Sequence, residues 1–543
     1  MKPSTKKILK WTGITVGSVV LIVLAFGIYL YSILPKPIGT PPTLQAALFQ
    51  KPIKPLPMEG KYIYKSATEL AAMIRHKEAT SMAVVKEHLA HIKNNNWKYN
   101  ALIWLREAEA LQEAQLADEA VAKGDTLKKP LLGVPVTIKE MFWVKGSPST
   151  MNVKMMGFIA PRDGEAVQQI KSSGAIVLGT TNVPYMLSDY QTQGEVYPTG
   201  NNPYDTTRTP GGSTGGGAAA LAAGFSSLEL GSDLGGSIRV PAAFCGLYAL
   251  KPTFGSVNIS QSTGPDTTTK FTRMALASAG PLARHAEDLE LMWHIIRETK
   301  RDERFQQKID RKPASTKALN RYKVAWMDEW KHGNETVQVS QQVKEKLKQL
   351  TNSLSTNGVA LRKDAPDTYN DMFESFLGSF ASMMGEGQPW LLRKLIALDF
   401  KKMDNGSPHF NAFYEAMGDA SPTKWNQIEA NRKVLINKWE TFFKQYDFFV
   451  CPITYDAAFP KCAQGSLLKG DNGKLMPYMN YFPYSYIFNA TGHPCVIVPM
   501  GLNQDGLPIG LQIVGSYHSE EELLRFTKLI SPLTSGFVKP KNL

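Results

Sequence analysis

The chain has 543 residues, of which 43% are hydrophobic, and 61 Lys and Arg against 48 Asp and Glu give it a net charge of +13. This apolar content excludes an intrinsically disordered protein. A basic balance is compatible with nucleic acid or an anionic membrane surface. However, the sequence has no basic block of five residues, no aromatic RNA-binding motif and no zinc-finger spacing, so a nucleic-acid partner is not expected.

The cysteines and histidines indicate neither a disulfide framework nor a metal site. The four cysteines are few and scattered: Cys245, Cys451, Cys462 and Cys495. Nine histidines are dispersed along the chain, and no CxxC, HExxH or EF-hand pattern occurs. We therefore expect no structural disulfides, no metal and no cofactor.

The amino end predicts a membrane anchor. Residues 1–10 form a basic N-terminus with four lysines, and residues 11–34 then carry no charge. An apolar helix of that length spans ~36 Å, enough for a hydrocarbon core of ~30 Å. A cleaved signal peptide is the alternative, although no small-residue cleavage site follows. We expect a single-pass membrane protein with a cytoplasmic N-terminus; the side on which the remaining chain lies stays open.

Beyond this segment, the sequence predicts a spacer and then one folded unit. Residues 35–60 are rich in proline and predict the spacer; residues 61–540 are expected to form the folded domain. Ser66-Ala-Thr-Glu69 is a capping-box pattern that predicts the start of a helix. A second helix, rich in Ala and Glu, is predicted for residues 106–123, before Gly124.

Strands and helices then alternate along the chain. Short apolar runs rich in β-branched residues predict strands, and stretches with helical periodicity separate them. The strands are expected at 132–139, 175–179, 322–327, 447–452, 495–501 and 509–515, and the helices at 163–174, 426–446 and 520–530. This alternation predicts an α/β fold with a single large mixed, mostly parallel sheet covered by helices on both faces.

Two serines lie in glycine-rich segments: Ser213 in PGGSTGGG and Ser237 in GSDLGGSIRVPAAFCG. A flexible linker is disfavoured because small and apolar residues follow each motif. A phosphate-binding loop is disfavoured because the Lys-Ser/Thr pair of a P-loop is missing. Gly211-Gly-Ser213-Thr-Gly215 fits the nucleophile-elbow pattern, but turn residues precede it where that elbow needs a strand.

A serine activated by a lysine is the alternative that accounts for both motifs. The two glycines before Ser237 allow a turn that points consecutive N–H groups inward, where they can stabilise an oxyanion. A nucleophilic serine needs a base, and neither motif contains a histidine. Lys139 ends an apolar strand on the same face as Thr137, and burial would lower its pKa enough to make it neutral near pH 7. The alternative is a lysine that reaches solvent at the strand's end.

In this order along the chain, GVPVTIKE, PGGSTGGG and GSDLGGSIRVPAAFCG resemble the amidase signature family of serine hydrolases. LKPTFG (250–255), GPLARHAEDL (280–289) and the segment TGHPCVIVPMG…GLPIGLQIVG extend the resemblance over about Ser66 to Ile530. The resemblance implies the amidase signature fold and hydrolysis of amides without metal or cofactor.

The family uses a Ser–cisSer–Lys triad. On the matching positions, Ser237 would be the nucleophile, Ser213 the bridging serine after a cis Gly212–Ser213 peptide bond, and Lys139 the base. The segment around the nucleophile would supply the oxyanion hole and its supports: the backbone N–H groups of Leu234, Gly235, Gly236 and Ser237, and the side chains of Asp233 and Arg239.

Within the family, the apolar N-terminus, Lys139-Glu140 and TNVPYML (181–187) are similar to membrane-anchored fatty acid amide hydrolases. The resemblance therefore implies a small amide substrate, with N-acyl and fatty acid amides as candidates, and allows a homodimer. The amidase component of glutamyl-tRNA amidotransferase shares the triad, so a general small-amide or amidotransferase-type amidase is an alternative. A membrane-tethered binding relative without activity is another.

Thr214 stands where a second serine is common in the family, and we expect this difference to be tolerated. Two segments stay open at this level. A second difference is that Met151-Asn-Val-Lys154 replaces a segment usually rich in small residues and glycine. The second difference leaves the shape of the acyl pocket undefined. Residues 371–403 are rich in Phe, Met, Leu and Trp, and they form either helices packed on the core or an apolar lid or second membrane contact.

Overall fold

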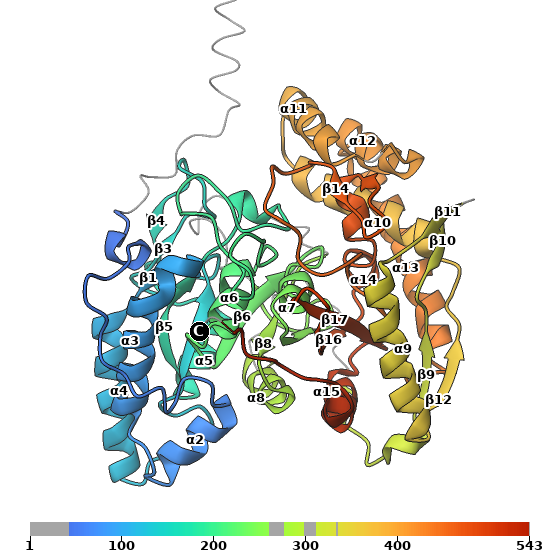
Figure 1. Cartoon of the computed structure of the whole chain (residues 1–543). Coiled ribbons are helices and arrows are strands. Elements are labelled where there is room, and N and C mark those ends of the chain that lie inside the picture. The colour runs from blue at the N-terminus through green and yellow to red at the C-terminus, as the bar shows by residue number, and fades with distance from the viewer. Residues whose placement is uncertain (1–42, 260–275, 298–310, 333–334, 405, 542–543) are drawn as a thin grey trace, which may run out of the picture.

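The computed structural model describes residues 43–259, 276–297, 311–332, 335–404 and 406–541. An eleven-stranded sheet crosses the molecule, from β1 and β5 on one flank to β9 and β12 on the other (Figure 1). In spatial order its strands are β1 (Leu102–Leu105), β5 (Ile176–Thr181), β2 (Pro135–Lys139), β6 (Leu228–Asp233), β8 (Ser278–Ala283), β7 (Tyr248–Lys251), β16 (Cys495–Leu502), β17 (Pro508–Gly515), β13 (Phe448–Pro452), β9 (Lys323–Trp326) and β12 (Ala360–Lys363).

The sheet is mixed, as predicted, but it is not mostly parallel. Six of its ten neighbouring strand pairs are antiparallel. The four parallel pairs lie near the flanks, in β5-β2-β6 and in β13-β9-β12. Antiparallel neighbours can be joined by a short turn, as β16 and β17 are, whereas parallel neighbours need a longer crossover. The expectation of a mostly parallel sheet is therefore wrong for the central strands.

Helices cover both faces of the sheet. Side chains five positions apart on a strand point to opposite faces. On β17, a Cβ at Gly510 would meet Ala243, whereas one at Gly515 would meet Ser519. The helices are α2 (Ala67–Arg75), α3 (Ser81–Tyr99), α4 (Glu107–Ala122), α5 (Glu165–Ser172), α6 (Gly215–Ala222), α7 (Arg239–Phe244), α8 (Ala286–Ile296), α9 (Gln341–Thr356), α10 (Tyr369–Gly385), α11 (Trp390–Phe400), α12 (Asn411–Gly418), α13 (Pro422–Phe442), α14 (Ile487–Thr491) and α15 (Glu520–Ile530). Gly510 thus faces Ala243 in α7, and Gly515 faces Ser519, the residue directly before α15. Helices α7 and α15 therefore lie on opposite faces of the sheet.

The expectation of an N-terminal transmembrane helix needs correction. Across the described ranges, no helix combines the length and the apolar character that crossing a bilayer requires. The predicted anchor itself, residues 11–34, lies outside the described residues, as do the basic residues 1–10. A bilayer-spanning helix needs about 20 apolar residues, and no helix in the described ranges meets that requirement. Neither the transmembrane helix nor the single-pass membrane location is therefore supported.

The described part of the predicted spacer packs against the folded body. Residues Ala46–Phe49 form a short 3₁₀ helix whose Leu48 is buried. The Gln45 side chain bonds to the backbone of Leu105 through both its oxygen and its nitrogen. Residues before position 61 therefore contact the folded body.

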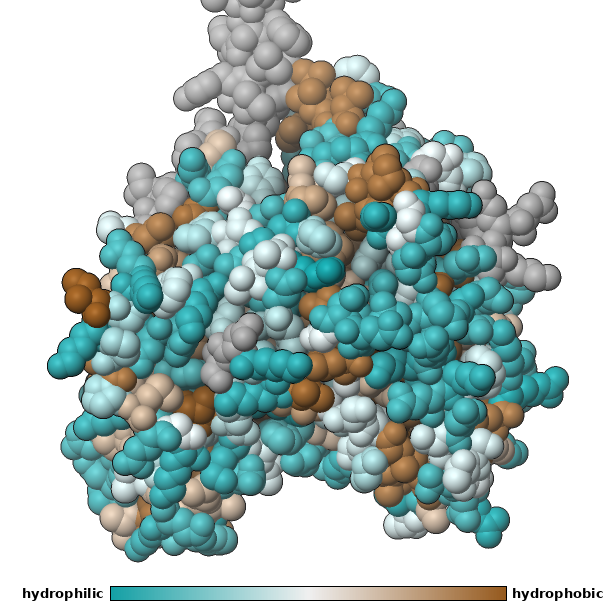
Figure 2. Space-filling model, in the orientation of Figure 1, coloured by the Kyte–Doolittle hydropathy of each residue, from teal (hydrophilic) through white to brown (hydrophobic). Residues whose placement is uncertain are grey.

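The apolar segment 371–403 divides into two helices with different surroundings. One face of α10 is buried, including Phe373, Phe376 and Leu377. No residue of α11 is buried, and its Trp390 and Leu398 are both 61% exposed. Figure 2 shows apolar side chains gathered where α11 lies in Figure 1. Helical packing on the core accounts for α10. Helix α11 packs on the core through the half-buried Ile396, Ala397 and Phe400 and leaves Trp390 and Leu398 exposed.

Candidate active site

Lys139 is fully buried at the end of β2, in a strand without an exposed residue. Its Nζ donates to Ser213 Oγ over 2.7 Å, to Ser232 Oγ over 2.9 Å and to the Ser232 carbonyl over 3.3 Å. The alternative of a lysine that reaches solvent is therefore excluded. The structure joins Lys139 and Ser213, which are far apart in sequence, through one direct hydrogen bond.

The two glycine-rich loops meet beside that contact. The Gly212–Ser213 peptide bond is cis, as the family resemblance implies. Thr214, directly after Ser213, donates its N–H to the carbonyl of Ser237 over 3.0 Å. Ser213 is 2% exposed and Ser237 8% exposed, so both hydroxyls lie in a largely enclosed space. The backbone thus brings Ser237 next to the Lys139–Ser213 pair.

The loop before Ser237 is held by the carboxylate of Asp233. Asp233 Oδ1 accepts the N–H of Gly236 over 2.8 Å, and Oδ2 accepts the N–H of Ile238 over 3.1 Å. Within the predicted oxyanion hole, the N–H of Gly236 therefore points at a carboxylate. The assignment of the N–H groups of Leu234, Gly235, Gly236 and Ser237 to that hole stays a prediction.

Gly236 can be nothing but glycine in this turn. Its φ is +111°, a conformation that side chains disfavour. A Cβ at this position would also lie 2.7 Å from Cβ of Ser485. The second glycine before Ser237 is thus required both by backbone geometry and by close packing.

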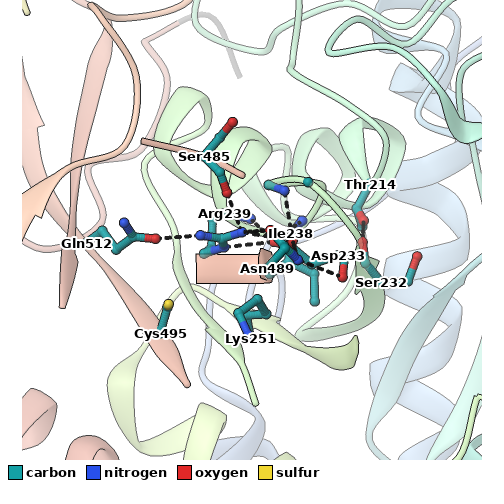
Figure 3. A network of polar contacts seen from close by, with 12 residues as sticks. Thr214, Ser232, Asp233, Ile238, Arg239, Lys251, Ser485, Asn489, Cys495 and Gln512 are labelled. Carbon is teal, nitrogen blue, oxygen red and sulfur yellow. Dashed lines mark hydrogen bonds and ion pairs between the residues drawn. The ribbon is translucent and has the colours of Figure 1, made fainter. Parts of the chain in front are cut away.

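Arg239 joins Asp233 to the centre of the sheet (Figure 3). Its Nε and Nη2 bond to the two Asp233 oxygens over 2.9 and 3.0 Å, and Nη1 donates to Gln512 Oε1. Nη2 also donates to Asn489 Oδ1 and to the Ser485 carbonyl. Both charges are fully buried, and the Arg239 guanidinium together with these hydrogen bonds holds the pKa of Asp233 well below its usual range despite burial. Asp233 therefore stays ionised.

Three residues of the site were not found from the sequence. Ser232 is the second hydroxyl partner of Lys139, and its position directly before Asp233 is the one signal that could have indicated it. Tyr190 donates its hydroxyl to the Gly235 carbonyl over 2.6 Å and contacts Ser485 Oγ at 3.0 Å. Phe376 of α10 reaches the same loop, since a Cβ at Gly235 would lie 3.1 Å from its ring. Tyr190 and Phe376 come from segments distant from Ser237 in the sequence, and no motif spacing points to them.

Burial controls the charge of the lysine. Desolvation lowers the pKa of Lys139 to about 7, although the carboxylates of Asp233, Glu229 and Glu140 act to raise it. A lysine with that pKa is largely neutral just above neutral pH and can accept a proton.

Nowhere in the described residues do three His, Cys, Asp or Glu side chains gather as a metal site would require.

Glu140 explains how the segment after Lys139 is held. Its carboxylate accepts the N–H and the hydroxyl of Thr150 and the N–H of Met151. Asn152 is also fully buried, with Oδ1 accepting the N–H groups of Val196 and Tyr197. The atypical segment 151–154 is therefore fixed by buried hydrogen bonds near the end of β2.

Comparison with known proteins decides the family. The Amidase family matches residues 83–524. The chain belongs to the amidase family. It is accordingly an enzyme that acts on amides, and the predicted resemblance to the amidase signature family is confirmed.

Two kinds of relative illustrate this membership. A glutamyl-tRNA(Gln) amidotransferase component from Alkaliphilus metalliredigens is 28% identical over 490 residues, which cover 83% of this chain and 92% of that protein. The structure of 6-aminohexanoate cyclic dimer hydrolase complexed with substrate matches with a TM-score of 0.71 and 21% identity, over 88% of this chain and 99% of that one. Fatty acid amide hydrolase matches with a TM-score of 0.66 and 20% identity, over 89% and 87%. At these identities, the two structures show that this amidase shares their fold.

Proposed function

We propose that this amidase cleaves the C–N bond of a small carboxamide through an acyl-enzyme on Ser237, with Ser213 and Lys139 as its proton relay. The observation that carries the proposal is the 2.7 Å hydrogen bond from Lys139 Nζ to Ser213 Oγ in a buried site beside Ser237. A lysine whose pKa is about 7 can act as a base at neutral pH.

In the acylation step, Lys139 takes the proton of Ser213 while Ser213 takes the proton of Ser237. The Ser237 oxygen attacks the carbonyl carbon, and backbone N–H groups of the 234–237 loop stabilise the oxyanion. The proton then returns through Ser213 to the leaving nitrogen as the C–N bond breaks. Ammonia or an amine leaves, and the acyl group stays on Ser237.

In the second step, water replaces the amine. The relay removes a proton from water, which attacks the acyl carbonyl, and Ser237 regains its proton as the carboxylic acid leaves. Asp233 and Arg239 take no part in proton transfer in this account. They hold the loop, because their hydrogen bonds fix the backbone that carries Ser237.

A substrate series on the purified full chain tests this proposal. Acetamide, benzamide and N-acyl amides of increasing chain length should be compared for release of ammonia or amine, with Ser237→Ala as the matched inactive control. Turnover that Ser237→Ala abolishes supports the proposal. A wild type that neither turns over any amide nor reacts with a fluorophosphonate would favour the binding relative without activity.

An amidotransferase-type amidase is the second candidate. It is favoured by the match to the glutamyl-tRNA(Gln) amidotransferase component over 92% of that protein's length. In that case, the substrate would be a primary amide such as glutamine, and the ammonia would pass to an acceptor held by a partner protein. Ammonia release from glutamine well above that from acetamide would support this candidate, whereas a clear preference for N-acyl amides would exclude it. A homodimer stays a prediction that sedimentation velocity can test.

A further inference from the structure

Glu229 is a buried carboxylate that the proposed mechanism does not use. It lies on β6, is 0% exposed and is aligned in register with Thr137 on the neighbouring strand β2. Residues aligned on neighbouring parallel strands point to the same face, and Lys139 lies two positions beyond Thr137. Glu229, Thr137 and Lys139 therefore share one face of the sheet.

The carboxylate of Glu229 reaches across β2. Thr181 on β5 donates its hydroxyl to Glu229 Oε1 over 2.7 Å, and Thr181 is aligned with Lys139. Because β2 lies between β5 and β6, this side-chain contact spans the strand that carries Lys139. The carboxylate consequently lies beside the stem of the lysine.

Helix α6 closes this space from the other side. A Cβ at Gly217 would lie 2.3 Å from Glu229 Oε1, so only glycine leaves room for the carboxylate. Gly217 follows Ser213 by four positions, in the helix that begins directly after the serine loop. Glu229 Oε2 has no hydrogen-bond partner among the described residues. The carboxylate is thus enclosed between α6, Thr181 and the lysine strand.

The other two carboxylates near Lys139 have hydrogen-bond or ion-pair partners of their own. Asp233 is paired with Arg239, and Glu140 accepts hydrogen bonds from the segment around Thr150. Burial raises the pKa of Glu229 to about 7, while the hydrogen bond from Thr181 and the charge of Lys139 act to lower it. Helix α6 has no titratable residue, and β8 places Leu282 opposite Glu229.

We propose that Glu229 is a positioning residue for Lys139, whose buried negative charge stabilises the ammonium that forms when Ser213 gives up its proton. The proposal rests on the proposed role of Lys139 as the base. An opposite charge at this range favours the charged form of a group. Glu229 therefore raises the pH at which Lys139 becomes available as a base, and the two groups titrate as a pair.

The test compares Glu229→Gln with the wild type in the full chain between pH 5 and 9. The readout is the rate of covalent labelling by a fluorophosphonate, together with kcat/KM for an amide that the wild type turns over. Without the carboxylate, the pH of half-maximal rate should fall by about one unit, and the plateau rate by about tenfold. An unchanged midpoint would overturn the proposal.

Two further variants keep the result interpretable. Glu520→Gln replaces another buried glutamate, which accepts the N–H of Thr253 and lies away from Lys139, and its midpoint should match the wild type. If Glu229→Gln does not fold, Thr181→Val removes the hydroxyl that stabilises the carboxylate and should shift the midpoint downward by a smaller amount; no shift there would also overturn the proposal. A wild type that is labelled but hydrolyses no amide contradicts the proposed function and leaves the labelling test of Glu229 intact.

Discussion

Two lysines of this amidase are fully buried at the ends of strands, Lys139 on β2 and Lys251 on β7. Burial lowers the pKa of the first to about 7 and of the second to about 8. Their hydrogen-bond partners differ. Lys139 donates to the hydroxyls of Ser213 and Ser232, whereas Lys251 donates to the carbonyl of Pro252 over 3.0 Å.

In the proposed mechanism, burial alone does not make a lysine a general base. A carbonyl accepts a hydrogen bond but has no proton to give, whereas a hydroxyl can both give and accept one. Lys139 contacts a hydroxyl beside the loop of Ser237, so its neutral amine has a proton to take. Lys251 has the depressed pKa without that neighbour, and we assign it no part in the reaction.

The largest expected effect is that of Lys139→Ala. Loss of a positioned base should reduce kcat/KM at neutral pH by about 10²- to 10⁴-fold. In the wild type, kcat/KM should rise with pH through about 7, because the lysine must lose its proton to act as a base. Steady-state kinetics across pH measure both effects. Near-normal activity of Lys139→Ala at neutral pH would remove the distinction between the two lysines.

Ser232→Ala should have a smaller effect. It removes one of the two hydroxyls that hold the Lys139 amine and leaves the contact to Ser213. A hydrogen bond of this kind contributes about 0.5–1.5 kcal/mol, so kcat/KM should fall by roughly 2- to 13-fold. The same kinetic assay checks this. A loss as large as that of Lys139→Ala would mean that Ser232, rather than Ser213, carries the proton.

Lys251→Met should have the smallest effect on activity. The substitution keeps an unbranched side chain in the buried space and removes an ammonium that burial disfavours. We expect the pH at which kcat/KM is half-maximal to stay at the wild-type value, and the melting temperature at pH 7 to be equal or higher. A shifted midpoint in this variant would show that Lys251 is coupled to the relay.

The sequence predicted the parts of this site that are contiguous. The strand ending at Lys139, the helix at 520–530 and the capping box at Ser66 have local patterns, and the structure contains all three. The antiparallel pairing of β6, β8 and β7 was not predicted, because pairing depends on which strands meet rather than on any one strand's pattern.

The same limit applies to the site residues. Motifs indicated Lys139 and the two serines, but Tyr190 and Phe376 reach the Ser237 loop from distant segments. The sequence also did not indicate that the Asp233 side chain folds back onto the Gly236 N–H. Such a contact depends on a rotamer and a turn together, and neither can be read from residue types alone.

Mapping the acylated residue tests the central claim most directly. The full chain should be labelled with a fluorophosphonate at pH 8, digested and analysed by mass spectrometry, with Lys139→Ala as the control in which labelling slows. The account predicts a single label on the peptide that contains Ser237, with none on the peptide that contains Ser213. A label on Ser213 would contradict the relay and support the nucleophile-elbow alternative.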